Sequence, residues 1–276
     1  MDMIILTPAR DEEDNLTYLY DSIVKYSDIS IIWYIFENGS TDRTLEVANN
    51  FPNHEKLRII VNSKVVADSY SVGNSLSNLL SDAFDFIKNQ NSDCTPKYFC
   101  ILDADVNFDE NFLLKLTDEF KINQNLQLVS GIGLNNGKHD GEGNDHVRGN
   151  ARIWRWEYIS TKGIPRGPAW DSISKFEVLM DGYDAYPIRA FYNCREMGAK
   201  QENFYFYGYA AYYRGVSLIF VFFKTLKMFI RKEGALSYLK GYLTNAFVHK
   251  EISDNESLRE YVRHYSIQRV FNWLKF

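Results

Sequence analysis

Several features that would define a function class are missing from this sequence of 276 residues. It contains three cysteines, Cys94, Cys100 and Cys194, without a CxxC pair, so we expect reduced thiols and neither a disulfide framework nor a zinc site. Lys and Arg form no long run, and the net charge is −5. This balance argues against a protein that binds nucleic acid by neutralising phosphates.

Long apolar segments are missing as well. No stretch reaches the ~18 to 20 apolar residues of a membrane span, and the first residues carry neither the basic region nor the cleavage site of a signal peptide. The expected location is therefore the cytoplasm, with the inner face of a membrane as an alternative. Aromatic residues, in contrast, make up 16% of the chain. Many of them lie in its last third, which indicates an adhesive or membrane-facing surface there.

Apolar segments with the length of strands alternate with helical segments in the first half of the chain. Leu76, Leu80, Phe84 and Ile87, for example, recur at helical spacing. The alternation predicts an α/β fold with an open, mostly parallel sheet flanked by helices, in which ligands bind at the carboxyl ends of the strands. Strands are expected at residues 3–6, 30–36, 57–61, 98–102 and 126–132.

The apolar segment at residues 98–102 ends in two carboxylates, Asp103 and Asp105. If the chain stays extended there, the period of 2 along a strand directs both carboxylates to the same side. Neighbouring carboxylates repel each other, and a cation between them relieves the repulsion. Hard oxygen ligands suit Mg²⁺ or Mn²⁺, which usually accompany phosphates. The pair therefore indicates either a site for a metal-bound phosphate or two residues that cap a turn.

Polar turns also follow the first two predicted strands. In residues 37–42, Glu37 or Asn38 could bond the edge of a base or ribose, although capping of the next helix accounts for much of the pattern. In residues 7–13, hydroxyl and backbone groups could hold a nucleotide. A solvated acidic first turn that complements the helix dipole is the alternative.

Together and in this order, residues 7–13, 37–44 and 102–105 resemble the family 2 glycosyltransferases of the GT-A fold. The resemblance covers roughly residues 3 to 190 and implies an inverting enzyme that uses a nucleotide-diphosphate sugar. It implies that Asp103 and Asp105 hold Mg²⁺ or Mn²⁺. The residues to which it assigns binding of the nucleotide sugar are Thr7, Ala9, Glu13, Glu37, Asn38, Lys64, Asp103 and Asp105.

Two details leave the donor open. The second turn of the family usually begins with Asp-Asp, whereas this one begins with Glu37 and Asn38, so the base contact and the identity of the nucleotide are not fixed. Lys64 follows the third strand, where the family often has a basic residue near the nucleotide, but it can equally be a solvated loop lysine.

Residues 148–156 and 167–171 resemble the acceptor half of the same family. There an acid at a helix start acts as the general base, and Asp171 matches it, with Trp170 in place of the first member of the usual Glu-Asp pair. An inverting transfer needs such a carboxylate to take the acceptor proton. Simple N-capping is the alternative. Arg152, Trp154 and Trp170 are expected to bind the acceptor.

Residues 133–150, rich in Gly, Asn, Asp and His, are expected to form a mobile loop that closes over the donor. Its histidines, His139 and His146, could approach the metal or be solvated. Residues 217–232 are strongly apolar, with basic residues at their end, and too short to span a bilayer. They indicate either helices in the interface of an anionic membrane or a buried helix on the catalytic domain.

We therefore expect a GT-A-like catalytic domain at residues 1–200, with a nucleotide-sugar half at 1–132 and an acceptor half at 133–200. An aromatic and basic helical region follows at 201–276. The expected activity is transfer of a sugar to a hydroxyl of a glycan or lipid-linked acceptor, in cell-surface polysaccharide biosynthesis. One alternative is a sugar-phosphate nucleotidyltransferase, although such enzymes usually begin with a Gly-rich basic loop that this chain lacks. The other is an inactive nucleotide-sugar-binding or scaffold protein.

Overall fold

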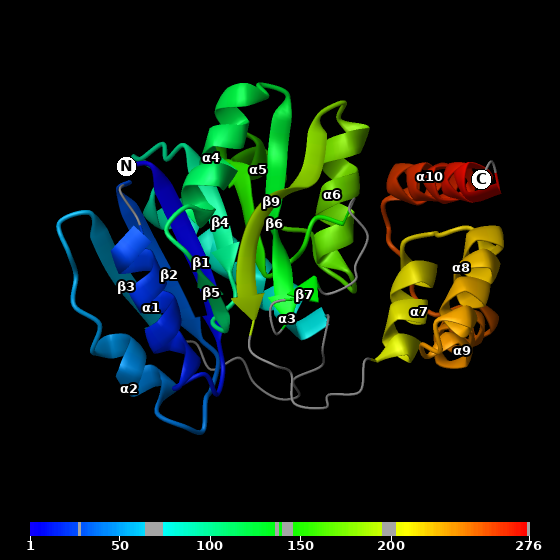
Figure 1. The fold of residues 1–276 in the computed structure, drawn as a ribbon, viewed down its shortest axis with the longest axis horizontal. Coiled ribbons are helices and arrows are strands. Elements are labelled where there is room, and N and C mark those ends of the chain that lie inside the picture. Colours follow the sequence, from blue (N-terminus) through cyan, green and yellow to red (C-terminus); the bar gives the residue numbers. More distant parts are fainter. Residues whose placement is uncertain (27–28, 64–73, 136–137, 140–145, 195–202, 275–276) are drawn as a thin grey trace. The chain divides into compact units, whose positions relative to one another are not determined.

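The computed structural model describes residues 1–26, 29–63, 74–135, 138–139, 146–194 and 203–274. The chain divides into two compact units (Figure 1). The first, which we call the sheet unit, comprises Met1–Arg166 and Trp170–Glu196. The second, the helical unit, comprises Gly167–Ala169 and Met197–Phe276. Lys64 lies outside the described residues, so its predicted contact with the nucleotide sugar has no structural counterpart here.

A single sheet runs through the sheet unit in the order β3-β2-β1-β4-β8-β6-β9-β5, with β7 beside β6. The first four strands in this order are parallel neighbours, and beyond β4 the pairing is mixed, because β8 runs antiparallel to both β4 and β6. The predicted open α/β sheet is confirmed. The strands are β1 Met3–Ala9, β2 Ile31–Glu37, β3 Leu57–Ser63, β4 Tyr98–Leu102, β5 Val106–Phe108, β6 Leu126–Asn135, β7 Lys138–His139, β8 Ala151–Arg155 and β9 Asp184–Cys194.

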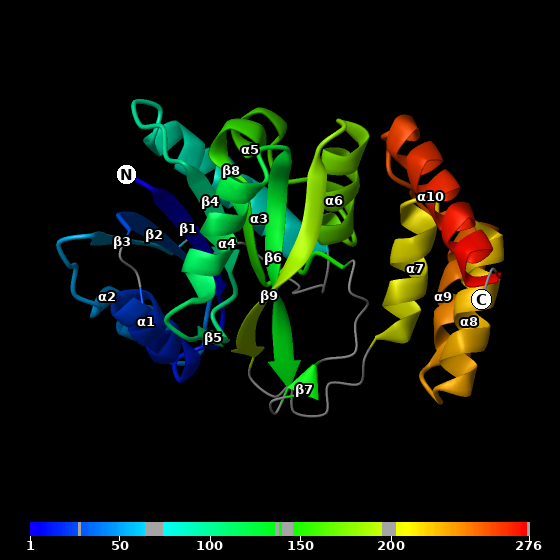
Figure 2. The ribbon, with the colours of Figure 1, turned by 45° about the horizontal axis from the view of Figure 1, so that its top comes forward.

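Helices cover both faces of this sheet (Figures 1 and 2). Side chains of β1 alternate between two apolar clusters, with Ile5 packed toward α1, α2 and α4 and Leu6 packed toward α3, α5 and α6. Strands buried on both faces explain the continuous apolar runs in the sequence. The helices are α1 Asn15–Tyr26, α2 Thr44–Asn49, α3 Asn74–Gln90, α4 Phe112–Ile122, α5 Trp156–Lys162 and α6 Trp170–Met180.

Strand β4 ends at Leu102, as expected. Of the two conformations considered for Asp103 and Asp105, the structure has the turn and not the extended chain, because Val106 N–H donates to the Asp103 carbonyl at 3.1 Å. The turn lets β5 pair antiparallel with β9. Part of the expected loop at residues 133–150 is strand, since β6 continues to Asn135 and pairs with β7. The expected mobility of the loop concerns residues of which several lie outside the described part.

The helical unit packs short helices against one another. Helix α7 lies against α9 so closely that a Cβ atom at Gly208 would be 2.0 Å from the Tyr238 carbonyl oxygen, and one at Gly241 would be 2.0 Å from that of Tyr205. Glycine is therefore required at both crossing points. Among the described residues, no helix is long and apolar enough to cross a membrane. The helices are α7 Phe204–Tyr213, α8 Leu218–Ile230, α9 Ala235–Phe247 and α10 Glu256–Leu274.

Candidate active site

The turns after β1 and β2 interlock at the carboxyl edge of the sheet. Thr41 N–H donates to Asp11 Oδ1 at 2.7 Å, and Arg43 donates to Glu13 Oε2 from its backbone N–H at 2.9 Å and from Nε at 3.2 Å. In the opposite direction, Glu13 N–H donates to Asp42 Oδ2 at 3.1 Å. These reciprocal bonds tie the two turns into one rim, because each turn satisfies backbone groups of the other.

Several residues predicted to bind the nucleotide sugar build this rim. Thr7 is fully buried, and its hydroxyl accepts a hydrogen bond from Trp33 Nε1 at 2.9 Å. Ala9 is buried, and its carbonyl accepts from Asn38 N–H at 2.9 Å. Glu37 is buried as well and accepts from Ser40 N–H. The side chains of Thr7, Glu37 and Glu13 and the backbone carbonyl of Ala9 thus all form hydrogen bonds within the protein, and they hold the two turns in place.

Asn38 differs from its neighbours. Its amide oxygen is buried and has no hydrogen-bond partner within the described part of the chain. A buried acceptor without a partner costs about 1–3 kcal/mol, so such groups usually receive a donor from water or a ligand. The backbone N–H of Asn38 is already used by Ala9, which fixes the residue at the rim. A base that presents an N–H group would satisfy the amide oxygen.

Asp103 and Asp105 lie on the turn after the central strand β4. Burial raises the pKa of Asp103 from 3.8 to about 7, and the charges of Asp105 and then Glu12 add to this rise, while Arg152 opposes it. Glu12 belongs to the turn after β1, so the structure brings two of the three predicted segments together. Carboxylates that raise one another's pKa in this way form a site that favours a cation.

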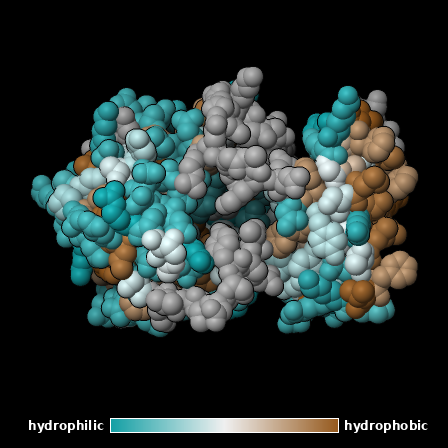
Figure 3. All heavy atoms as spheres, turned by 90° about the horizontal axis from the view of Figure 1, so that it is seen from below, coloured by the Kyte–Doolittle hydropathy of each residue, from teal (hydrophilic) through white to brown (hydrophobic). Residues whose placement is uncertain are grey.

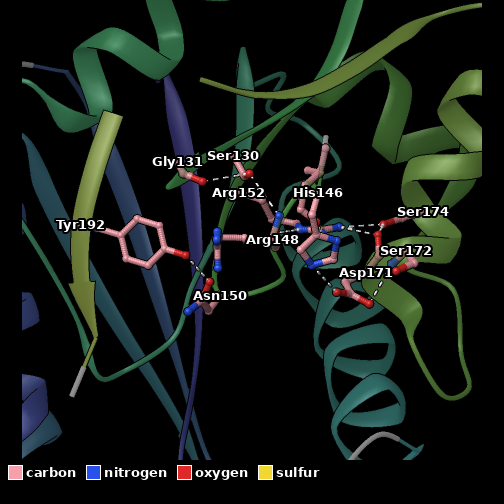
Figure 4. A network of polar contacts seen from close by, with 11 residues as sticks. Ser130, Gly131, His146, Arg148, Asn150, Arg152, Asp171, Ser172, Ser174 and Tyr192 are labelled. Atoms are coloured by element: carbon pink, nitrogen blue, oxygen red, sulfur yellow. Dashed lines mark hydrogen bonds and ion pairs between the residues drawn. The ribbon is translucent and has the colours of Figure 1, made fainter. Parts of the chain in front are cut away.

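Arg152, from β8, is a buried cation behind this edge (Figure 4). It stacks on the rings of Trp154 and Trp170, at 5.1 and 4.9 Å from their centroids. Burial lowers its pKa to about 10, so it stays charged, and its charge acts on both Asp171 and Asp103. Its hydrogen bonds go to Val147 O at 2.5 Å, Arg148 O at 2.5 Å, Ser174 Oγ at 2.7 Å and Asp171 O at 3.2 Å.

Asp171 lies in the first turn of α6 and is partly open to solvent. Its Oδ1 accepts from Ser172 N–H at 2.7 Å, and its Oδ2 lies 3.6 Å from His146 Nε2, as Figure 4 shows. The Asp171 and His146 side chains keep 24% and 31% of their surface exposed, so a ligand can reach both. Gly149 packs here too, since a Cβ atom there would lie 3.3 Å from the Trp170 ring. His146 therefore pairs with the predicted base.

The predicted acceptor residues are not on the surface. Arg152 and Trp154 are fully buried and Trp170 nearly so. Strand β8 lies in the middle of the sheet between β4 and β6, so helices cover its side chains on both faces. A sequence pattern of Arg and Trp cannot distinguish an exposed platform from an interior wall. In the structure Arg152 and Trp154 are interior residues behind Asp171, and their binding of the acceptor stays a prediction.

Other residues at this edge had no assigned role in the sequence analysis. Tyr192 hydroxyl donates to Asn150 Oδ1 at 2.5 Å, and Asn150 Nδ2 donates to Cys194 Sγ at 3.1 Å. Burial raises the pKa of Cys194 to about 12, and Asp105 and Asp103 add to this rise, so the thiol lies near the acidic pair. Only the pairing of β5 with β9 brings Cys194 there, and no local sequence signal predicts that long-range contact.

This fold, with carboxylates at the carboxyl end of a central strand and a partly exposed acid at the start of α6, defines the class: it is that of the GT-A glycosyltransferases. The sequence model of glycosyl transferase family 2 matches residues 4–173, more than half of the chain. The protein therefore belongs to glycosyl transferase family 2 and is a glycosyltransferase. The predicted family is confirmed.

Solved structures agree on the fold. Mannosyltransferase PcManGT from Pyrobaculum calidifontis, in complex with GDP-Man and Mn²⁺, has a TM-score of 0.59 at 14% identity, over 98% of this chain and 75% of that one. S. aureus TarS 1–349 has 0.54 at 13% identity, over 90% and 72%. Glucosyl-3-phosphoglycerate synthase from Mycobacterium tuberculosis, in complex with Mg²⁺ and UDP, has 0.51 at 14%, over 73% and 74%. A search of curated protein sequences gave no match.

Proposed function

We propose that this glycosyltransferase moves a sugar from a nucleotide-diphosphate sugar to a hydroxyl of a glycan or lipid-linked acceptor, with inversion at the anomeric carbon. The observation that carries the proposal is that Arg152 interacts with both of the acids to which we assign a role. Its side chain bonds to the Asp171 carbonyl at 3.2 Å, and its buried charge acts on both Asp171 and Asp103. A donor-binding acid and an acceptor-activating acid are the two groups that this reaction needs close together.

In this proposal Asp171 is the general base. The acceptor oxygen forms a bond to the anomeric carbon, the bond from that carbon to the diphosphate oxygen breaks, and the acceptor proton moves to the Asp171 carboxylate. The exposure of Asp171 supports this role, as does the buried Arg152, which lies behind its backbone carbonyl. Asp171 also bonds to Ser172 N–H, which keeps its carboxylate in place at the start of α6.

The proposed cofactor is Mg²⁺ or Mn²⁺, and the donor set fits it. Asp103 and Asp105 supply hard oxygen atoms. Burial, followed by repulsion from Asp105, raises the pKa of Asp103, and a bound divalent cation would offset both effects. Among the described residues, no group of three or more His, Cys, Asp or Glu side chains lies together as a ready metal site. Two carboxylates completed by diphosphate oxygens would match this arrangement, and the bound ion would neutralise the leaving diphosphate.

The rim of the first two turns is the proposed nucleotide site, within a donor half that we place at residues 1–132 and an acceptor half at 133–200. The unsatisfied amide oxygen of Asn38 supports a base contact there. PcManGT was crystallised with GDP-Man and Mn²⁺, and S. aureus TarS 1–349 with UDP-GlcNAc, which supports a nucleotide-diphosphate donor without selecting between uridine and guanosine. Because the proposed acceptor is a glycan or a lipid-linked sugar, we propose that the reaction belongs to the biosynthesis of a cell-surface polysaccharide.

A panel of UDP- and GDP-sugars tests the proposal. The purified chain is incubated with each donor and a panel of soluble glycan and lipid-linked acceptors, with Mn²⁺, Mg²⁺ or a chelator, and the nucleoside diphosphate released and the glycosylated acceptor formed are measured. We expect one donor to be consumed only with a divalent ion, and proton NMR to give a product of inverted configuration. Donor binding without release would indicate an inactive binding protein. Formation of sugar phosphate and nucleoside triphosphate from a donor and pyrophosphate would indicate a nucleotidyltransferase instead.

A further inference from the structure

Helix α8 carries a continuous apolar face that the other described residues of the helical unit leave uncovered. Phe222, Phe229 and Ile230 are 55%, 67% and 81% exposed, and Leu218 and Leu226 are about as exposed as Phe222. Positions 218, 222, 226 and 229 recur at the helical period, so these side chains share one side of α8. In Figure 3, brown side chains gather over the helical unit.

The opposite side of α8 already performs the packing role expected of a core helix. Val221, Thr225 and Met228 are buried within the unit. The exposed face is therefore surplus to the folding of the helical unit, and a face of this kind in a water-soluble domain usually marks a contact surface. Helix α8 has 13 residues, about 20 Å at 1.5 Å per residue, and so is too short to span a bilayer but long enough to lie along one.

Charge indicates which surface the face fits. Residues 203–274 contain ten Lys and Arg but five Asp and Glu, although the whole chain has a net charge of −5. Lys227, Arg231 and Lys232 are exposed at the carboxyl end of α8. Arg231 also approaches Glu233 at 3.8 Å, an exposed pair of the kind that contributes little. Positive charge is thus concentrated in the unit that bears the apolar face.

We propose that the apolar face of α8 docks the protein onto an anionic lipid bilayer. The exposed Phe, Leu and Ile side chains enter the boundary of the acyl chains, and the basic residues at the end of the helix contact lipid phosphates. A protein partner or a second copy of this chain would also bury the apolar face, but neither calls for the excess of positive charge around it. The inference depends on this surface alone and not on the proposed reaction.

Vesicle flotation of the full chain tests the docking. The probes are vesicles of phosphatidylcholine alone and of phosphatidylcholine mixed with phosphatidylglycerol, at low and at high salt. We expect flotation with the anionic vesicles, weaker flotation at high salt and little with the neutral ones, because salt screens the basic residues. Equal recovery in the soluble fraction under every condition would overturn the proposal.

Two variants on α8 separate the apolar and the charged contributions to lipid binding. Phe222→Ser with Phe229→Ser should lower the partition coefficient by roughly 100-fold, since two exposed aromatic side chains lose their burial in lipid. Lys227→Gln should lower it about fivefold at low salt only. The matched controls lie in the sheet unit, where Ile122→Ser removes a side chain that is also exposed and Lys115→Gln an exposed charge. Both controls should float like the wild type.

A second copy of the chain is the main rival occupant. Sedimentation of the wild type and of the double Phe variant measures it without lipid. Concentration-dependent association of the wild type that the variant loses, together with no flotation on either vesicle, would contradict the proposal and assign the face to self-association. Flotation of both proteins to the same extent would also contradict it, because the lipid contact would then lie elsewhere on the chain.

Discussion

The two units treat their aromatic and apolar side chains in opposite ways. In the sheet unit the largest of them, including Trp33, Trp154 and Phe112, are fully buried in the two layers beside the sheet. In the helical unit Phe229 and Ile230 are mostly exposed. The sheet unit thus buries its largest apolar side chains, while Leu114 and Ile122 are exposed on α4, and the polar groups available to a ligand lie at its strand ends. The helical unit exposes apolar side chains that its own folding does not need, and an exposed apolar face of this kind usually marks a binding surface.

The largest expected effect concerns the polar edge of the sheet unit. Asp171→Asn should lower turnover by roughly 10²–10⁴-fold with little change in donor affinity, since the amide cannot take the acceptor proton. Steady-state kinetics and donor titration measure the two quantities. Glu157→Gln, at the first turn of α5, is the control for loss of an acid from a helix start, and it should keep full activity. If both variants turn over alike, Asp171 only caps α6.

The next expected effect tests whether the sheet unit stays folded when the helical unit is destabilised. Gly241→Ala should disrupt the helical unit by about 3 kcal/mol or more, because the new methyl group would overlap the Tyr205 carbonyl. Limited proteolysis should then cleave after the sheet unit, while turnover on a soluble acceptor persists. Ser237→Ala, an exposed position on α9, should have no effect. Loss of donor binding in Gly241→Ala would contradict the claim that the sheet unit folds independently of the helical unit.

Much of the sheet unit was predictable from sequence, for a physical reason. Strands buried on both faces require continuous apolar runs, and the turns that end them are polar, so the step from Leu102 to Asp103 is enough to mark a strand end. The family followed from three such turns in order. What was not predictable depends on distant pairing. The path of β8 through the centre of the sheet buries Arg152, and the pairing of β5 with β9 brings Cys194 to the acidic turn.

In the helical unit the sequence predicted an apolar helix but not which of its faces is buried. Ten of the sixteen residues at 217–232 are apolar, and residues 218–223 are apolar without a break, so helical periodicity does not reveal which face is buried. The structure resolves this, because Val221, Thr225 and Met228 contact the rest of the unit. Similarly, Asp171 looked the same in sequence whether base or cap. Its partial exposure and its pairing with His146, a residue expected either near the metal or in solvent, became visible only in three dimensions.

A smaller effect should appear in stability against pH. The pKa of Asp103 is raised from 3.8 to about 7, so the native state binds more protons than the unfolded state between these values. The free energy of unfolding should therefore fall as pH rises from 4 to 7. Glu177 is half-buried, and desolvation raises its pKa from 4.5 to about 7, so it should contribute similarly. Thermal unfolding with Asp103→Asn and with Glu177→Gln should each flatten the profile.

The effect of Mn²⁺ on thermal stability should distinguish Asp103 from Glu177. It should raise the Tm of the wild type more at alkaline pH than at pH near 5, by about 5 °C, because a cation binds ionised Asp103 and Asp105. Glu177→Gln should keep this dependence on the ion, and Asp103→Asn should lose it. A shift in Tm that is the same at both pH values in every variant would separate the acidic turn from metal binding.

The most direct test of the central claim, that the acidic edge of the sheet unit binds a metal-bound nucleotide-diphosphate donor, is calorimetry of Asp105→Asn. Donor affinity is titrated with and without Mn²⁺ in the wild type, in this variant and in Asp109→Asn, an exposed acid beyond β5 that serves as the control. We predict that Mn²⁺ tightens donor binding in the wild type and in Asp109→Asn but not in Asp105→Asn, with an unchanged fold. An equal effect of Mn²⁺ in all three proteins would contradict the account.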